Sequence, residues 1–487
     1  MFKCLYEFMS FHSNYQKLSE FIILLTIILS GFVTTTVFKL NNFYTFPNLD
    51  EMLWYPRSRI FWDKMCEFDF SGLVQSLQPG ITVYWFTGFL MKFIDFDFGD
   101  VGRRIAEKEA EGLDFNAVAN ANDAAVYEAY NAASFAFNVP LLLLTAIFFI
   151  LFYYLLRKLK FNRIIASFSV FFIATNYFFV YWNTPSDKML NFFLVLSFLT
   201  FLVYVGGKSF CNNGSDKIND ILRISIVKKN ASSFMARLAS GIKFGARKRK
   251  YLILSAMLGA WAVLSKISAM FILPFYFFTF VFYAWPLDKQ KIKSIVKDYL
   301  VWLAVFIPVC IIFLPSIIAN PSEVYGLFFN DSDNSVLEKN YSGEGYFSGL
   351  QDYFTLLVNV TFMSPAVFYF LIIFLFLKFK KKYKYLFGSL PGKHLKAITA
   401  FILLFILMVT LISSNHDTRF MSPAFMLANI FSAIGVYAAA EILRKKFKFS
   451  KVIYPAAALV LFLAHLFTII SSGFLMEMVM KKVMGIE

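Results

Sequence analysis

Five groups of charged or polar residues in this sequence could take part in chemistry. Paired carboxylates can act as a general base, with one orienting the other. Arg and Lys hold phosphate groups through charged hydrogen bonds. The five groups are Asp50-Glu51, Gln78 before Pro79-Gly80, Asp187 in a Thr-Pro-Ser-Asp run, Lys266 between two apolar stretches, and the run 415–420, which contains His416 and Arg419.

Each group alone also fits a plain structural explanation. Asp50-Glu51 could be solvated loop acids, and Gln78 could stand in an ordinary turn. Asp187 suits the start of a helix, and Lys266 could extend its ammonium to the membrane surface. The run 415–420 could be a simple polar loop. A functional interpretation therefore needs elements that bring the groups together.

The composition indicates where those elements lie. The chain has 487 residues, of which 59% are hydrophobic and 16% charged, and its mean hydropathy is +0.61. Soluble domains average about 45–50% apolar and about 25% charged residues. An ordinary soluble enzyme, a disordered chain and a disulfide scaffold are thereby excluded. The net charge of +16 does not indicate nucleic-acid binding, because the Lys and Arg residues lie between long apolar runs.

The apolar runs predict an all-α polytopic membrane protein, with residues 1–487 forming a single integral membrane domain. A helix crosses the bilayer core with about 20 apolar residues. The stretch 251–285 would make one helix about 52 Å long, so we expect two helices that turn near Lys266. About 11 transmembrane helices are then predicted, at 19–38, 133–156, 164–182, 189–206, 251–265, 269–285, 299–319, 355–377, 397–413, 421–441 and 452–475.

The charges of the loops support this division. Basic residues dominate alternate loops, whereas 40–132 has fourteen Asp and Glu against seven Lys and Arg, and 321–352 has six against one. Basic loops stay in the cytoplasm, so the N-terminus is predicted to be cytoplasmic and both acidic loops to be outer. A single helix over 251–285 would reverse the side of every later loop, so basic and acidic loops would no longer alternate across the membrane. All five groups then lie on the outer or lumenal face, which is the outside of the plasma membrane if the protein is bacterial.

The first outer loop, 40–132, is expected to contain interfacial helices beside the Asp-Glu pair. An amphipathic helix is predicted over 56–68, with Pro56 at its start. The aromatic segment 81–94 is short for a span and is expected at the interface as well. Residues 103–130 are Ala-rich and charged, which predicts a solvated helical insert.

The order of these motifs resembles the GT-C glycosyltransferases, in the branch of protein O-mannosyltransferases and lipid A aminoarabinose transferases. Members have an Asp-Glu pair in the first outer loop, and later a His-Pro-Gly-like element that Gln78-Pro79-Gly80 resembles. An acidic residue at the start of the fourth span is matched by Asp187. The stretch 259–266, GAWAVLSK, is similar to a Gly-Leu-Ala-x-Leu-Thr-Lys element, and 419–423, RFMSP, to an Arg-Tyr-x-x-Pro element.

The resemblance implies an inverting transfer from a polyprenyl- or dolichyl-phosphate sugar, with Asp50 as general base. Glu51 would orient Asp50 or hold the acceptor, and Asp187 would bind sugar or acceptor. Gln78 stands where the family has His and cannot titrate near neutral pH. No metal and no cofactor are implied beyond the lipid-linked co-substrate. The donor phosphate is assigned to Lys266 and Arg419, with Arg57, Arg59 and His416 as further substrate-binding residues.

Other functions remain open at this point. The partners expected are membrane lipids, the lipid-phosphate donor and a protein, lipid or glycan acceptor. The main alternative is a multi-span transporter or flippase of lipid-linked sugars. Such proteins often contain inverted repeats and charges near mid-depth, whereas this chain has no evident repeat. A polytopic protein without catalysis would leave the Asp-Glu pair unexplained.

Overall fold

The computed structural model describes residues 49–73, 80–93, 124–174, 185–207, 234–325, 365–412 without 381, 382 and 389, 421–447 and six single residues between 454 and 463. Within these residues the chain is helical and contains no strand, as the sequence predicts. The predicted spans 19–38 and, for the most part, 452–475 lie outside them, so the number of 11 is not tested. The extent of the single membrane domain stays a prediction as well.

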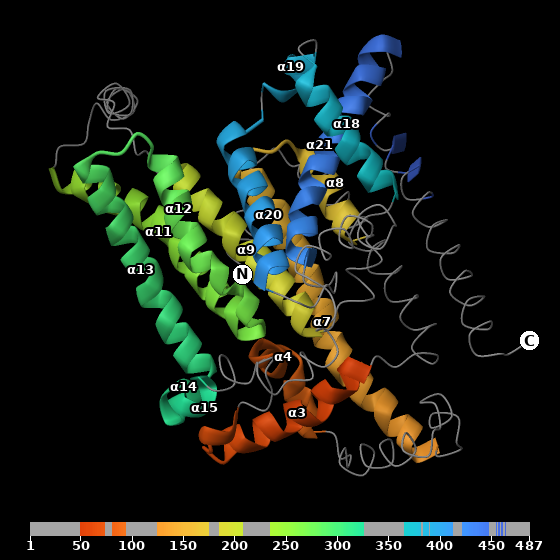
Figure 1. The fold of residues 1–487 in the computed structure, drawn as a ribbon, viewed down its shortest axis with the longest axis vertical. Coiled ribbons are helices and arrows are strands. Elements are labelled where there is room, and N and C mark those ends of the chain that lie inside the picture. Colours follow the sequence, from red (N-terminus) through yellow and green to blue (C-terminus); the bar gives the residue numbers. More distant parts are fainter. Residues whose placement is uncertain are drawn as a thin grey trace, which may run out of the picture.

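Eight helices form a bundle in this part of the chain (Figure 1). They are α7 (Ala124–Lys158), α8 (Arg163–Ala174), α9 (Pro185–Gly207), α11 (Phe234–Ser265), α12 (Ile272–Ala284), α13 (Lys289–Phe313), α20 (Gly392–Ile412) and α21 (Ser422–Phe447). A further helix, α18 (Pro365–Phe379), packs against α21, and the single turn α19 (Lys384–Phe387) follows it.

Four stretches in the described residues are long and apolar enough to cross a membrane. Three shorter apolar helices accompany them, at Arg163–Ala174, Ser268–Ala284 and Phe370–Phe379. These helices indicate an integral membrane protein. The four long stretches are Asn138–Lys158, Ser186–Gly207, Lys289–Phe313 and Ser422–Phe447.

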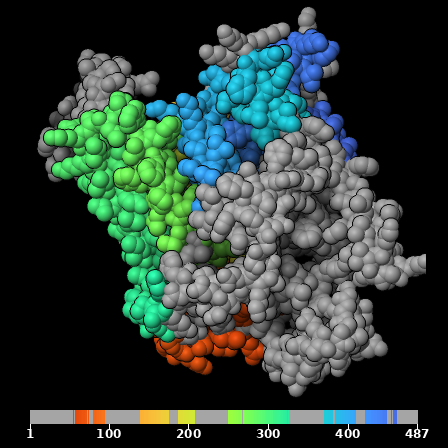
Figure 2. All heavy atoms as spheres, in the orientation of Figure 1, coloured from red at the N-terminus to blue at the C-terminus, as the bar shows by residue number. Residues whose placement is uncertain are grey.

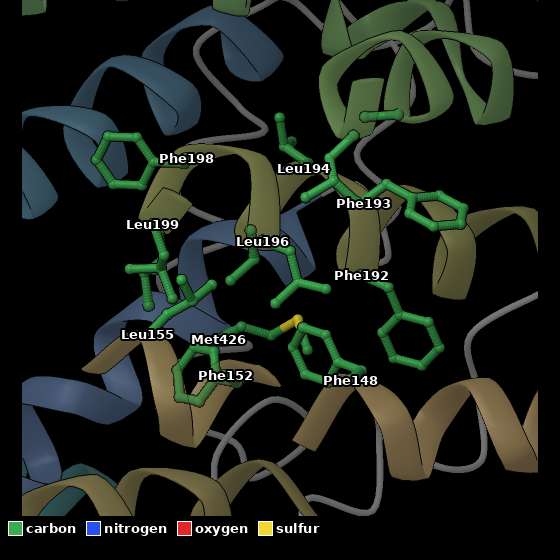
Figure 3. Packing of buried hydrophobic residues seen from close by; sticks show 14 of the residues in the cluster. Phe148, Phe152, Leu155, Phe192, Phe193, Leu194, Leu196, Phe198, Leu199 and Met426 are labelled. Carbon is green, nitrogen blue, oxygen red and sulfur yellow. The ribbon is translucent and has the colours of Figure 1, made fainter. Parts of the chain in front are cut away.

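Helix α9 lies at the centre of the bundle and contacts α7, α11, α12 and α21. Every residue from 186 to 202 is buried. Figure 3 shows its Phe192, Leu196 and Leu199 facing Phe148 of α7 and Met426 of α21. The Phe148 and Phe192 rings stack with centroids 4.7 Å apart. A helix that is apolar all round needs such neighbours on every side, so α9 can serve as a rigid reference for residues at its ends.

The predicted division of 251–285 is confirmed. Helix α11 ends at Ser265, Lys266 is extended with φ −159° and ψ 131°, and the 3-10 turn η4 (Ile267–Phe271) leads into α12. Helix α11 begins at Phe234 rather than at 251, however. Lys and Arg are good helix formers, so a helix continues through a basic segment that a hydropathy profile excludes. For the same reason α13 starts at Lys289. Helix α7 starts at Ala124, within the predicted insert 103–130, because that segment is rich in Ala, the best helix former.

Basic side chains gather at one end of the bundle, which we call the basic end. There α7 ends, α13 begins and α21 ends (Figure 1). Asp288 caps α13 at this end, because its carboxylate accepts a hydrogen bond of 2.8 Å from the Lys291 amide. The basic end includes Arg157, Lys158, Lys160, Arg163, Lys289, Lys291, Lys293, Lys378, Lys380, Lys393, Lys396, Arg444, Lys445 and Lys446.

Short helices cover the opposite end of the bundle (Figures 1 and 2). They are α3 (Leu49–Cys66), η1 (Ser71–Leu73), α4 (Ile81–Phe86), η2 (Gly88–Phe93), α14 (Ser316–Ala319) and α15 (Pro321–Tyr325). The Trp85 indole donates to the Phe313 carbonyl at 2.9 Å, and the Ser316 hydroxyl donates to the Phe70 carbonyl at 2.6 Å. These bonds fasten the short helices to the end of α13.

One sequence prediction about this end needs correction. Helix α3 begins at Leu49, so Pro56 lies inside it rather than at its start. An interior Pro costs a helix about 3 kcal/mol, which the packing of Trp54, Tyr55 and Phe61 can offset, since all three are buried. The predicted interfacial segment 81–94 forms two short helices, α4 and η2, with Thr87 between them.

Close contact between α18 and α21 generates a test of the packing. A Cβ atom on Gly435 would lie 2.0 Å from the Phe370 carbonyl oxygen, a backbone atom that cannot swing away. We expect Gly435→Ala to destabilise the purified protein by about 1–3 kcal/mol, read as a lower apparent melting temperature. Gly392→Ala is the control, because no atom lies within 4 Å of its added Cβ. Equal melting temperatures for the two variants would contradict this packing.

Candidate functional site

A buried ion pair joins two of the predicted site residues. Asp187 lies in the first turn of α9, and Lys266 occupies the break after α11. The Lys266 Nζ donates to Asp187 Oδ1 at 2.7 Å, and the two side chains are 10% and 2% exposed. Lys266 needs an anionic partner at such a depth. The structure provides one in Asp187, which the sequence treated as a separate group.

Lys188, which sequence reasoning missed, adds a second buried cation. It follows Asp187 directly and is 5% exposed. Lys188 thus places a second buried cation in the first turn of α9. The available signal in the sequence was the position of Lys188 on the first turn of an otherwise apolar helix.

A hydrogen bond connects the helix α4 to the Lys266 break. The Thr82 and Ser265 hydroxyl oxygens are 2.5 Å apart, and both residues are fully buried. The Ser265 hydroxyl already donates to the Trp261 carbonyl at 2.7 Å, so Thr82 is the donor in this bond. The aromatic segment after Gln78-Pro79-Gly80 is therefore fixed beside Lys266, although the two are far apart in the sequence.

Gly80 allows α3 and α4 to approach each other closely. Its φ of 48° is in the left-handed region, where Gly is favoured. A Cβ atom there would lie 2.0 Å from the Trp54 ring. The Trp62 indole of α3 donates to the Tyr84 carbonyl of α4 at 2.9 Å. Together these contacts fix one face of α3 against α4.

Asp50 and Glu51 belong to the first turn of α3 and not to a loop. Further along the same helix, the Arg57 guanidinium lies 5.9 Å from the Trp54 ring centroid and is half-buried. The predicted base thus belongs to the helix that packs against the α4 segment.

The two predicted Arg residues differ in their surroundings. Arg59 reaches Asp63 at 4.0 Å in a half-exposed pair. Arg57 acts electrostatically on the buried Tyr84 hydroxyl: burial raises the pKa of Tyr84 above its usual value, and Arg57 opposes that shift. Tyr84 therefore stays protonated. Of the two cations, Arg57 is the better placed to contact a substrate beside α4.

Gln78, His416 and Arg419 lie outside the described residues. The helices that flank 415–420 are described, and α20 contacts η4, the turn that follows Lys266. Phe271 of η4 and Phe405 of α20 have ring centroids 5.0 Å apart. The described residues hold no cluster of three or more metal-binding side chains. The expectation that no metal takes part stays a prediction.

No family model matches the sequence, and no curated protein sequence matches it either. The structure resembles the apo form of an oligosaccharyltransferase from Archaeoglobus fulgidus, with a TM-score of 0.50, 13% identity, and coverage of 94% of this chain and 55% of that chain. The structure of AglB from the same organism, in complex with an inhibitory peptide and a dolichol-phosphate, has a TM-score of 0.47 and 13% identity. The match covers 93% of this chain and 55% of that chain.

This chain therefore spans about half the length of the solved proteins that it matches. The likeness concerns the fold alone, because the identity is 13%. It does not single out the mannosyltransferase and aminoarabinose transferase branch that the sequence resembles.

The ion pair predicts a strong dependence of stability on both partners. We expect Asp187→Asn or Lys266→Met alone to destabilise the protein by about 3–5 kcal/mol, because each leaves a buried charge without this partner. The double variant should recover much of that loss. Lys64→Met, which breaks a half-exposed pair with Asp69 at 3.2 Å, should cost less than about 1 kcal/mol. Strictly additive losses in thermal unfolding would argue against coupling between Asp187 and Lys266.

Gly80 provides a second test. We expect Gly80→Ala to lower both the melting temperature and any activity of the protein, since its left-handed φ and the Trp54 ring leave no room for a methyl group. Gly392→Ala again serves as the control. A Gly80→Ala protein with unchanged melting and activity would show that α3 and α4 do not depend on this contact.

Proposed function

We propose that the chain is a membrane glycosyltransferase that moves a sugar from a polyprenyl- or dolichyl-phosphate donor to an acceptor hydroxyl or amine. One observation carries this proposal: the end opposite the basic end gathers the first turn of α3, the α4 segment and the Asp187–Lys266 pair. Fold alone does not define an activity, but a fold that resembles a solved oligosaccharyltransferase and gathers these groups at one end supports transfer chemistry there.

The chemistry needs a base and a place for a leaving phosphate. Asp50 would take the proton of the acceptor while the acceptor oxygen or nitrogen attacks the anomeric carbon. The bond between that carbon and the phosphate oxygen breaks, its electron pair stays on the phosphate, and the anomeric configuration inverts. Glu51 would orient Asp50 or the acceptor. Cations stabilise the charge that develops on a leaving phosphate.

The contacts refine which cations would serve the donor. Lys266 already shares its charge with Asp187, so we assign it to positioning the donor head together with Lys188. Arg57 lies half-buried on the same helix as position 50, which supports a role at the phosphate, whereas Arg59 pairs with Asp63. Arg419 and His416 stay proposed ligands from the sequence resemblance. Asp187 would hold Lys266 and bind the sugar or the acceptor.

The location of the charges also favours transfer over transport. Transporters usually bind their substrate near the membrane midplane, whereas Asp187 and Lys266 lie at one end of the bundle (Figure 1). The basic end fits the cytoplasmic side, which would place the site on the outer or lumenal face with the N-terminus inside. Incubation of the purified protein with polyprenyl-phosphate sugars, and mass spectrometry of glycans and glycolipids from cells with and without it, test the activity.

The proposed base has a direct test. We expect Asp50→Asn to lower sugar transfer by about 10²–10⁴-fold, because the amide cannot accept the acceptor proton, while melting stays like that of the wild type. Asp63→Asn is the matched control on the same helix, since the Asp63 carboxylate pairs only with Arg59 and with Lys92 at 3.6 Å among the interactions described. Wild-type turnover by Asp50→Asn would remove Asp50 from the mechanism.

A further inference from the structure

The side chain of Asn191 is buried without hydrogen-bond partners. It lies on α9 and is 0% exposed. Within the described part of the chain, neither its Oδ1 nor its Nδ2 has a hydrogen-bond partner. A buried polar group left unpaired costs about 1–3 kcal/mol. A Leu of similar size would avoid that cost in this apolar helix, so the amide needs another explanation.

Asn191 differs from the other described side chains that have a buried polar atom without a hydrogen-bond partner. Thr200 and Ser432 each present a hydroxyl oxygen, which can rotate toward the preceding helical turn. At Asn429 only Oδ1 is unpaired. Among the described residues, Asn191 is the side chain with two separate polar atoms unpaired, one of which can only donate and the other only accept.

Its position on α9 relates it to the ion pair. Asn191 follows Asp187 by four residues, so the two side chains start from one face of α9, with Cβ atoms about 5–6 Å apart. Seven residues after Asn191, Phe198 occupies the same face, and its ring stacks on Phe401 with centroids 4.3 Å apart. Asn191 therefore lies between a charged pair on one side and an aromatic layer on the other.

The chemistry of a carboxamide narrows the ligand. It offers one acceptor and one donor group side by side, which match the oxygen and the hydrogen of a hydroxyl group. A phosphate offers acceptors only and is better served by Lys266 and Lys188. A lipid tail would gain nothing from an amide. The neutral, hydroxyl-bearing part of a lipid-linked substrate is its sugar.

We propose that Asn191 binds a hydroxyl group of the transferred sugar and so extends the Asp187–Lys266 site one helical turn into the bundle. This inference rests on the proposed glycosyltransferase function. Asn191 is then a specificity-determining residue: it selects sugars that carry a hydroxyl at one ring position.

The test compares the wild type, Asn191→Leu and Asn429→Leu, the last as a control on α21. The donors are undecaprenyl- and dolichyl-phosphate hexoses and their monodeoxy analogues. We expect Asn191→Leu to melt at or above the wild-type temperature without donor. Its kcat/KM for the preferred donor should fall about 10- to 100-fold. For the wild type, kcat/KM should be lower with one monodeoxy donor than with the complete donor, by a similar factor. For Asn191→Leu, kcat/KM should be equal for these two donors.

Other results would overturn the inference. An Asn191→Leu protein that melts well below the wild type would show a structural role for the amide. A fall in the kcat/KM of Asn191→Leu that is equal for every donor would also show a structural role. So would a matching loss of donor selectivity in Asn429→Leu. If the wild type transfers sugar but Asn191→Leu keeps its donor selectivity, this inference alone fails. If the wild type transfers no sugar from any donor, the proposed function and this inference both fail.

Discussion

The cost of burying charge governs how this end of the molecule is built. The Lys266 ammonium and the Asp187 carboxylate each lose hydration, and only close pairing compensates for that loss. Pairing at 2.7 Å requires the first turn of α9 and the break after α11 to stay in register. The extensive contact between α9 and α11 and the Thr82–Ser265 bond maintain it. The short helices at this end are organised around the pair.

The sequence predicts the helical class and the break at Lys266, because hydropathy and the position of one cation determine both. It misplaces the starts of α11 and α13, since Lys and Arg extend each helix beyond its apolar part, and the start of α7, where Ala does the same. It also places the start of α3 at Pro56 rather than at Leu49. The partnership of Asp187 with Lys266 could not be predicted, because pairing across 79 residues depends on how α9 and α11 pack. Asn191 also escaped notice, because only the packed structure shows that its amide is unpaired.

Sequence and structure support the function at different levels. Short motifs in order resemble those of GT-C enzymes, and the fold resembles that of a solved oligosaccharyltransferase. Neither identifies the sugar or the acceptor, because specificity resides in a few side chains rather than in the fold. The residues near the α9 start, namely Asp187, Lys188 and Asn191, are the ones to which we assign recognition of the proposed donor.

The break at Lys266 also has a consequence for biosynthesis. If α11 and α12 enter the bilayer as a pair, the turn between them is inserted together with the Lys266 ammonium. Inserting a charged side chain is unfavourable, and the apolar residues of α12 oppose that cost. Asp187 is synthesised earlier than Lys266, so its carboxylate is already present when Lys266 is inserted. The order of the two residues along the chain thus suits assembly in the direction of translation.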